Sequence, residues 1–306
     1  MYMSLLSFFI EKKHSSNIAP LRSVITEFHK QKKAIGHFNI SNLEGFHAII
    51  ESSQELNLPV VIGVSEGEED IVGIHEAVAL VRSAQARGIQ VYLNADHHYS
   101  LERVRACLDA GFDMAIADGA KLSIEENIKL TRSCVDYAKE LNTKTGRDVL
   151  IEAELGYIGQ SSKVYDSLPL DVVESSMTTP VEAYNFVTSA GIDLLAPAVG
   201  NVHGIIADGE PPLHSERVAE IVKNVSVPLV LHGASGNTDS DIRACINAGV
   251  AMVHVNTELR VAYTNALRKA LMDNPTESAP YKYCKPAREA MKEVVKTKMK
   301  LFAGVE

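Results

Sequence analysis

Short β-branched runs alternate with longer helical patterns along most of this chain, and this alternation is the feature that most limits how it can fold. Eight such pairs follow one another from residue 34 onward. The expected strands are Ala34–Asn39, Val60–Ser65, Ile89–Asp96, Met114–Asp118, Val149–Leu155, Leu194–Ala198, Pro228–His232 and Ala251–Asn256. Eight βα units predict an α/β fold in which the strands close into a parallel (β/α)8 TIM barrel.

The character of these strands and of the segments between them supports this fold. The strands do not alternate between apolar and polar residues, as expected when both faces are buried. The intervening segments are amphipathic; in residues 124–130, for example, apolar residues recur at intervals of about four, as in a helix that covers a sheet. An open doubly wound sheet is the alternative architecture. The chain lacks its Gly-x-Gly-x-x-Gly turn and spreads polar residues over many strand ends, which favours the barrel.

Length and charge limit the domain organisation and the partners. With 306 residues, the chain fits a single barrel domain at 21–306, preceded by an extension at 1–20 and ending in a C-terminal helical extension. The 30 basic residues are outnumbered by 39 acidic ones, and no basic run is interleaved with aromatics, so nucleic acid is not an expected partner. No apolar stretch reaches the roughly 18 residues that a membrane span needs. A small molecule is the expected partner.

The cysteines and the N-terminal residues indicate the compartment. Cys107, Cys134, Cys245 and Cys284 are widely spaced without a Cys-x-x-Cys pair, which argues against a disulfide framework or a thiolate zinc site. The apolar run at 5–10 lacks a preceding basic region and a clear cleavage site, so we expect a packing segment and not a secretion signal. Both features favour a reducing cytoplasm.

Three histidines stand where expected strands run into loops. They are His97, His203 and His232. Three imidazoles with one open position form the coordination pattern of a catalytic zinc. For any single histidine, a lone polar residue at a strand end is the simpler interpretation. Because the placement is repeated three times, we expect a metal site at the mouth of the barrel.

The other strand ends are also polar, and barrel enzymes place their chemistry there. The second strand ends in Ser65, the third in Asp96-His97 and the fourth in Asp118-Gly119. The last two loops, 232–236 and 254–257, occupy the places where barrels commonly hold phosphate through backbone N–H groups. A tight turn into a helix is the alternative for the glycine-rich loop. These features predict a phosphorylated small molecule beside a metal.

The chain resembles the class II, zinc-dependent fructose- and tagatose-bisphosphate aldolases from about Lys33 to its end, as a divergent member. The motifs occur in the family's order, and together they are highly specific. The motifs that carry the resemblance are Phe38-Asn39-Ile40, Val64-Ser65-Glu66-Gly67, Asp96-His97-His98, Glu152-Ala153-Glu154-Leu155-Gly156, His203-Gly204, His232-Gly233-Ala234-Ser235-Gly236, Asn256-Thr257-Glu258 and Lys285-Pro286-Ala287-Arg288-Glu289-Ala290.

The resemblance implies a role for each group of residues. It implies that His97, His203 and His232 hold Zn²⁺, that Asp96 is the proton donor or acceptor toward the aldehyde, and that Glu154 contacts a second or displaced cation. Arg288 of the C-terminal motif is the implied phosphate anchor. The other implied substrate-binding residues are Ser65, Gly204, Gly233, Ala234, Ser235, Val255, Asn256 and Thr257.

The chemistry implied by the resemblance agrees with these parts. Cleavage of a carbon–carbon bond beside a ketone leaves an enediolate, whose charge a zinc ion can delocalise as a Lewis acid, so that no Schiff-base lysine is needed. The expected function is a cytoplasmic lyase of carbohydrate metabolism and glycolysis. It would cleave or form a fructose-1,6-bisphosphate-like ketose phosphate, with dihydroxyacetone phosphate as one product. A homodimer or homotetramer is the expected assembly.

Two departures from the family pattern concern proton transfer. Where the family carries a Gly-Gly-x-Glu-Asp loop, whose carboxylate moves the enediolate proton, this chain has Ser161 and Ser162; Asp166 is a nearby alternative. On the eighth strand, His254 replaces the family's asparagine and shares a face with Asn256. His254 could be an acid or base, an extra ligand, or a space-filling residue. We assign it as catalytic, with a pH dependence near neutrality as its expected signature.

Two further departures concern the ends of the pocket. The family's Asp-Gly-Ser after the fourth strand is Asp118-Gly119-Ala120, and Tyr281 stands where an Asp-Pro-Arg motif would supply an arginine. The zinc site is therefore expected to be intact and the aldehyde end altered. A non-catalytic phosphosugar-binding or subunit-stabilising homologue is the alternative to an active lyase. Proton exchange in dihydroxyacetone phosphate would distinguish the two.

Overall fold

The computed structural model describes residues 18–159, 163–168 and 177–305, and its centre is a closed barrel of eight parallel strands. Around the barrel the strands follow the order β1, β2, β3, β4, β5, β7, β9 and β10, and β10 pairs with β1 to close it. Their bounds are β1 Ile35–Asn39, β2 Val60–Ser65, β3 Val91–His98, β4 Met114–Ala117, β5 Leu150–Leu155, β7 Leu194–Pro197, β9 Leu229–Leu231 and β10 Val250–Val255. The predicted TIM barrel is confirmed.

Each expected strand lies within two residues of an observed one, and two differences matter for the site. Strand β3 continues to His98, so His97 lies inside the strand and not in the loop that the sequence suggested. A second, two-stranded parallel sheet, which the sequence did not predict, joins β6 Val164–Tyr165 to β8 Ile205–Ile206. This small sheet ties the segment after β5 to the segment that carries His203.

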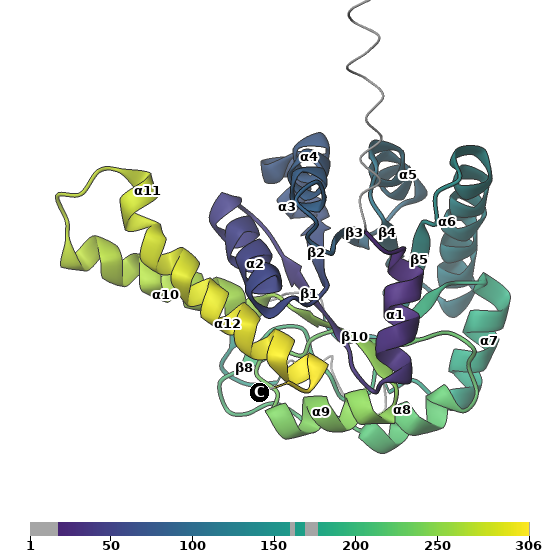
Figure 1. The fold of residues 1–306 in the computed structure, drawn as a ribbon. Coiled ribbons are helices and arrows are strands. Elements are labelled where there is room, and N and C mark those ends of the chain that lie inside the picture. Colours follow the sequence, from purple (N-terminus) through teal and green to yellow (C-terminus); the bar gives the residue numbers. More distant parts are fainter. Residues whose placement is uncertain (1–17, 160–162, 169–176, 306) are drawn as a thin grey trace, which may run out of the picture.

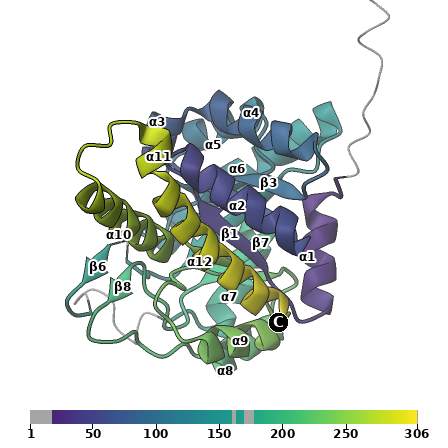
Figure 2. The same ribbon diagram turned by 60° about the vertical axis from the view of Figure 1, so that its left-hand side comes forward.

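Helices surround the barrel, as Figures 1 and 2 show. Their bounds are α2 Leu43–Leu56, α3 Glu66–Val72, α4 Ile74–Gln85, α5 Leu101–Ala110, α6 Ile124–Thr145, α7 Pro180–Ala190, α8 Ser215–Val222, α9 Asp239–Ala248 and α10 Thr257–Asp273. Local capping fixes several starts: Ser123 with Glu126 and Thr179 with Glu182 form reciprocal capping boxes at α6 and α7. The outward-facing strand residues and these helices form the main apolar core.

A separate apolar core closes the amino-terminal end of the barrel. Helix α1 (Leu21–Lys30) supplies the buried side chains Leu21 and Ile25 to this core. They cluster with residues near the starts of the strands, among them Ile35, Tyr92 and Met252. Apolar packing therefore fills the inside of the barrel at this end, and the histidines and carboxylates of the strand ends lie at the other end, where the strands finish.

The C-terminal helices form the expected extension. Helix α11 (Pro280–Tyr283) leads into α12 (Lys285–Ala303), which runs beside α2 and α10 (Figure 2). At its far end, the buried Phe302 stacks on Phe38 with ring centroids 6.5 Å apart. The extension is therefore packed onto the barrel at β1.

Other expectations about the chain have mixed outcomes. The apolar run at 5–10 lies outside the described residues, so the packing segment expected there stays a prediction. All four cysteines are free thiols. Within the described part of the chain, no helix combines the length and the apolar character that a membrane crossing requires.

We expect that Ile25→Ala destabilises the barrel without touching the site. Ile25 is 2% exposed in the amino-terminal core, so truncation leaves a cavity and should lower the free energy of unfolding by about 2–5 kcal/mol. Denaturant unfolding measures this loss, with the exposed Glu27→Ala on the same helix as the control. Equal stability of the two variants would show that the packing of α1 against the amino-terminal end does not stabilise the barrel.

Candidate metal and active site

Two adjoining cavities occupy the carboxyl ends of the strands. The outer cavity has a volume of about 420 Å³, and the inner one has a volume of about 40 Å³. The residues that line both are Asp96, His97, His203 and Asn256. These four residues therefore stand between two compartments of one pocket.

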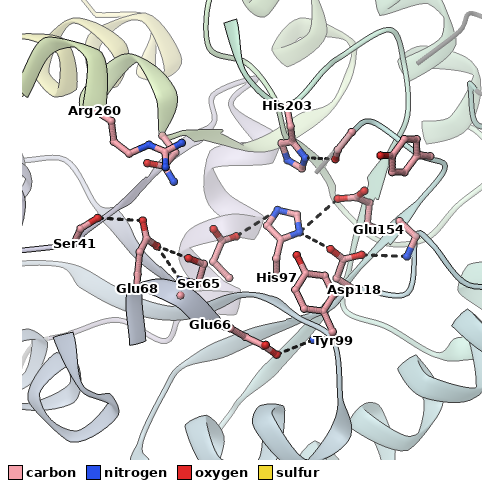
Figure 3. A pocket seen from close by; sticks show the side chains of 16 residues that line it. Ser41, Ser65, Glu66, Glu68, His97, Tyr99, Asp118, Glu154, His203 and Arg260 are labelled. Atoms are coloured by element: carbon pink, nitrogen blue, oxygen red, sulfur yellow. Dashed lines mark hydrogen bonds and ion pairs between the residues drawn. The ribbon is translucent and has the colours of Figure 1, made fainter. Parts of the chain in front are cut away.

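Four side chains from four different strands or loops converge at this junction. His97, Glu154, His203 and His232 each offer one ligand atom, and these atoms all lie within 4.8 Å of one another. His97 Nε2 lies 3.2 Å from His232 Nδ1, which lies 3.6 Å from Glu154 Oε2. In Figure 3 the His97 ring lies below His203 and beside Glu154. Glu154 Oε2 is buried without a hydrogen-bond partner, so this donor set fits a divalent metal ion.

Each of the three histidines is oriented through its other ring nitrogen. His97 Nδ1 contacts Asp118 Oδ2 at 2.8 Å, and His203 Nδ1 contacts the Gly159 carbonyl at 2.7 Å. His232 Nε2 contacts Glu152 Oε1 at 2.6 Å. These contacts fix the rings so that His97 Nε2, His203 Nε2 and His232 Nδ1 are left for a metal.

The orienting roles of Asp118 and Glu152 were not recognised from the sequence, although both residues stand in strand-end motifs that it singled out. The local sequence gives no sign of which histidine each carboxylate reaches. Asp118 lies 21 residues from its partner His97, and Glu152 lies 80 residues from His232.

Buried charge distinguishes His97 from the other two histidines. Burial by itself would lower its pKa, but the carboxylates of Asp96, Asp118 and Glu154 overcome this and raise the pKa of His97 to about 10. Burial lowers the pKa of both His203 and His232 to about 3. Without a metal, the carboxylates therefore hold one positive charge at His97, and a bound cation would meet the same electrostatic demand.

Asp96 is held as a carboxylate at the junction. Its Oδ2 accepts a hydrogen bond from Asn39 Nδ2 at 2.7 Å, and its Oδ1 is buried without a hydrogen-bond partner. Burial would raise its pKa, but His97 and His254 together hold the pKa of Asp96 well below its usual range. Asp96 is thus ionised at neutral pH and has one oxygen available to a substrate.

A stack of three histidines lies behind this junction. His254 stacks on His37 with ring centroids 3.5 Å apart, and on its other side lies His232 at 4.1 Å. Gly63 makes room, because a Cβ there would lie 2.2 Å from the His37 ring. His254 lines the inner cavity, and its Nδ1 lies 3.6 Å from Asp96 Oδ1.

The environment of this stack changes the expected titration of His254. Burial, reinforced by the neighbouring His37 and His232, holds the pKa of His254 well below its usual range. The residue is therefore neutral at pH 7, and the pH dependence near neutrality that the sequence suggested does not follow from this environment. The stacking partner His37 was not identified from the sequence.

Most of the predicted substrate-binding residues lie at the pocket. Ser65 lines the outer cavity, and the inner cavity is lined by Gly204, Gly233, Ser235, Asn256 and Thr257. Ala234 and Val255 are buried in the main apolar core and line neither cavity, so their contribution is limited to the backbone. Gly233 has φ 58°, and a Cβ at this position would lie 2.4 Å from the Val202 carbonyl, which explains the glycine.

The phosphate contact expected of Arg288 stays a prediction, because the residue lies outside both cavities. It lies on α12, forms an ion pair with Glu51 of α2, and lines neither cavity. The outer cavity is instead lined by Arg260 from the first turns of α10, which the sequence analysis missed (Figure 3). Its position three residues after Thr257 was the available signal.

Two other departures from the family pattern, at Tyr281 and Asp166, lie away from the pocket. Tyr281 is 76% exposed on α11, and Asp166 is exposed after β6. Neither residue lines the two cavities. Ser161 and Ser162 lie outside the described residues, so their expected position in place of the family's loop carboxylate stays a prediction.

Comparisons with known proteins agree with this geometry. A family model described as "Fructose-bisphosphate aldolase class-II" matches residues 19–306. A protein named "Fructose-bisphosphate aldolase" from Staphylococcus epidermidis is 36% identical over 291 residues, which are 93% of this chain and 97% of that protein.

Two solved structures also cover nearly the whole chain. The YdjI aldolase from Escherichia coli K12 superposes with a TM-score of 0.75 at 31% identity, covering 93% of this chain and 97% of that one. A putative fructose-1,6-biphosphate aldolase from Coccidioides immitis has a TM-score of 0.76 at 30% identity and covers 92% and 96% of the two chains.

We expect that His203→Ala abolishes tight metal binding. The substitution removes one of three converging imidazoles, and the remaining donors no longer complete the coordination sphere. Elemental analysis of the purified variant measures metal per chain, and the control is His75→Ala, which changes an exposed histidine on α4. One tightly bound metal ion per chain in the His203 variant would rule out this ligand.

Proposed function

Because the chain belongs to the class II fructose-bisphosphate aldolase family, a family of metal-dependent lyases, we propose that it is a zinc-dependent aldolase with dihydroxyacetone phosphate as one product. The observation that carries this proposal is that candidate metal ligands and a carboxylate meet at the junction of the inner and outer cavities. Asp96, His97 and His203 line both cavities, so the bond to be broken would lie beside the metal ligands and a carboxylate.

The donor set favours zinc as the metal. Three imidazoles with a carboxylate are the nitrogen and oxygen ligands that zinc takes in catalytic sites. When bound, zinc would supply a Lewis acid that stabilises the negative charge developing on the ketose oxygens during cleavage. Neutral His203 and His232 would leave most of the ion's charge available for this purpose.

The inner cavity is the proposed site of the dihydroxyacetone phosphate part. Thr257 begins α10, a helix of 17 residues, and the N–H groups of a helix start favour an anion. The glycine loop at Gly233 and Ser235 lies on the same cavity. These backbone donors support a phosphate held between residues 233–235 and 255–257.

Asp96 is the proposed acid–base group toward the aldehyde. Asn39 holds one of its oxygens, which leaves Oδ1 to take the proton of the C4 hydroxyl while the C3–C4 electron pair moves toward the C2 carbonyl. In the reverse direction the same oxygen would return the proton to the new hydroxyl. Its position at the boundary between the cavities supports this role at a bond that would cross from one cavity to the other.

The outer cavity is the proposed site of the aldehyde product. Arg260 is the one lysine or arginine among the described residues that line it, alongside carboxylates such as Glu66. A guanidinium suits a phosphate on the aldehyde, which supports a ketose bisphosphate like fructose 1,6-bisphosphate as the substrate. We further propose a cytoplasmic, homo-oligomeric enzyme of carbohydrate metabolism and glycolysis, which relatives named "Fructose-bisphosphate aldolase" and the four free cysteines support.

The proposed function predicts that the zinc-loaded protein exchanges one prochiral hydrogen of dihydroxyacetone phosphate with deuterium from the solvent without any aldehyde. Proton NMR in D₂O follows the loss of that signal. Dihydroxyacetone without its phosphate is the matched control, and it should exchange at least tenfold more slowly because it lacks the contacts of the inner cavity. No exchange by the zinc-loaded protein would favour a non-catalytic homologue that binds the phosphosugar.

We propose that His254 handles the proton at the enediolate carbon. It lines the inner cavity, its Nδ1 is 3.6 Å from the Asp96 carboxylate, and burial keeps it a neutral imidazole. Its Nε2 is buried 3.9 Å from Glu152. A neutral imidazole beside the ionised Asp96 can take up a proton and release it within one turnover.

We expect that His254→Asn lowers the rate of hydrogen exchange in dihydroxyacetone phosphate by about two orders of magnitude or more, with zinc content unchanged. The variant His37→Asn is the control for the stack, since His37 packs on His254 without lining either cavity. Unchanged exchange by His254→Asn would make His254 a space-filling residue. An equal loss in both variants would assign the effect to packing.

A further inference from the structure

Strand β3 contains an irregularity at the most important point of the site. It pairs with β4 as Ala95 opposite Ala115 and then His98 opposite Ala117, so β3 holds one more residue than its partner over this stretch. A β-bulge of this kind breaks the alternation of side chains. As a result, two consecutive residues, Asp96 and His97, both line the pocket.

The bulge places His97 in an unfavourable backbone conformation. Its φ is 51°, in the left-handed region that residues other than glycine rarely adopt. Such a conformation persists only when the surrounding contacts hold it. We therefore expect contacts from neighbouring residues that hold the chain in place immediately after His97.

A buried cluster behind β3 provides such contacts. His98 points away from the pocket, and its Nε2 contacts Glu69 Oε1 of α3 at 2.7 Å. The Cys107 thiol of α5 donates to the same oxygen at 2.6 Å, and Arg103 of α5 forms an ion pair with Glu69 Oε2 at 2.9 Å. The side chains of His98 and Glu69 are 0% and 2% exposed, so the contact is shielded from water.

Helix α3 holds the next residue as well. The backbone N–H of Tyr99 donates to Glu66 Oε1 at 3.1 Å. On the other side of the bulge, Glu68 of the same helix accepts from Asn39, the residue that holds Asp96. One short helix thus holds His98 and Tyr99 directly and is linked to Asp96 through Asn39.

The cluster does not have the geometry of a second site. Zinc bonds of about 2.0–2.3 Å would hold tetrahedral ligand atoms roughly 3.3–3.8 Å apart, but Glu69 Oε1 lies 2.7 Å from His98 Nε2 and 2.6 Å from Cys107 Sγ. Arg103 already balances the carboxylate. Burial raises the pKa of the Cys107 thiol, which leaves it a protonated donor and not a nucleophile.

We propose that Glu69 is a positioning residue: by holding His98 it fixes the bulge that aims Asp96 and His97 into the pocket together. Its consequence for catalysis rests on the proposed function. Glu69 lines neither cavity and therefore acts only through β3. The carboxylates of α3 thereby become part of the active-site architecture without touching the substrate.

The test compares the zinc and cobalt forms of Glu69→Ala, Glu69→Gln and the wild type. For Glu69→Ala we expect a 10- to 100-fold loss of zinc affinity by chelator competition, altered visible absorption of the Co²⁺ form, and a kcat at least tenfold lower with KM within about threefold. Glu69→Gln, whose amide oxygen can still accept from His98, should recover part of each loss. Asp70→Asn is the matched control, since Asp70 lies on the same helix and contacts the same Arg103 but is 71% exposed.

A lower melting temperature of Glu69→Ala with wild-type zinc affinity and a wild-type Co²⁺ spectrum would overturn the proposal and leave Glu69 a purely structural role. If Glu69→Ala does not fold, Glu69→Gln carries the test, and a Co²⁺ spectrum and zinc affinity equal to those of the wild type would overturn it. If the wild type itself binds no metal, the proposed function fails, and crystal structures decide the positioning role. His97 should then leave the left-handed region in the Glu69 variant, and an unchanged bulge would overturn the proposal.

Discussion

The site depends on the placement of buried negative charge around His97. The carboxylates of Asp96 and Asp118 lie beside the His97 imidazole together with a third acid, Glu154, whose pKa is raised well above its usual range by burial and by these acidic neighbours. Such a cluster is costly unless a positive charge is placed within it, because buried charges of one sign repel strongly and lose their hydration. A metal ion or a protonated His97 meets this need.

The barrel separates this polar mouth from two apolar regions that stabilise it. Helix α1 packs into the amino-terminal end, and the outer helices cover the sheet from outside. Polar residues such as His37, Asn94 and Glu152 form an intermediate layer inside the barrel. His37 contacts Asn94 at 3.0 Å, so part of this layer is paired within itself. Apolar packing provides the stability that allows the mouth to hold groups that are unfavourable to bury.

The substrate pocket combines retained and altered parts of the family pattern. The proposed metal ligands converge as the resemblance implied, and most residues of the glycine loops line the inner cavity. The cation at the outer cavity is different from the one expected, because Arg288 is committed to Glu51 while Arg260 faces the pocket. The histidine at position 254 has a stacking partner in His37 and space provided by Gly63, so its substitution is accommodated by residues from other strands.

The sequence by itself determined the fold class, the strands to within two residues, and the strand ends at which the candidate site lies. Hydrophobic periodicity and the order of the motifs are local properties, and parallel strands necessarily bring their carboxyl ends to one edge. Only the tertiary structure decided which partners orient the ligands. The pairing of His232 with Glu152, of His98 with Glu69, and of Arg288 with Glu51 joins residues 29 to 237 positions apart, and no local pattern encodes such contacts. The bulge at His97 is of the same kind, because it depends on the register between two strands and on a helix that holds the next residue, and neither is visible in the run Asp96-His97-His98 alone.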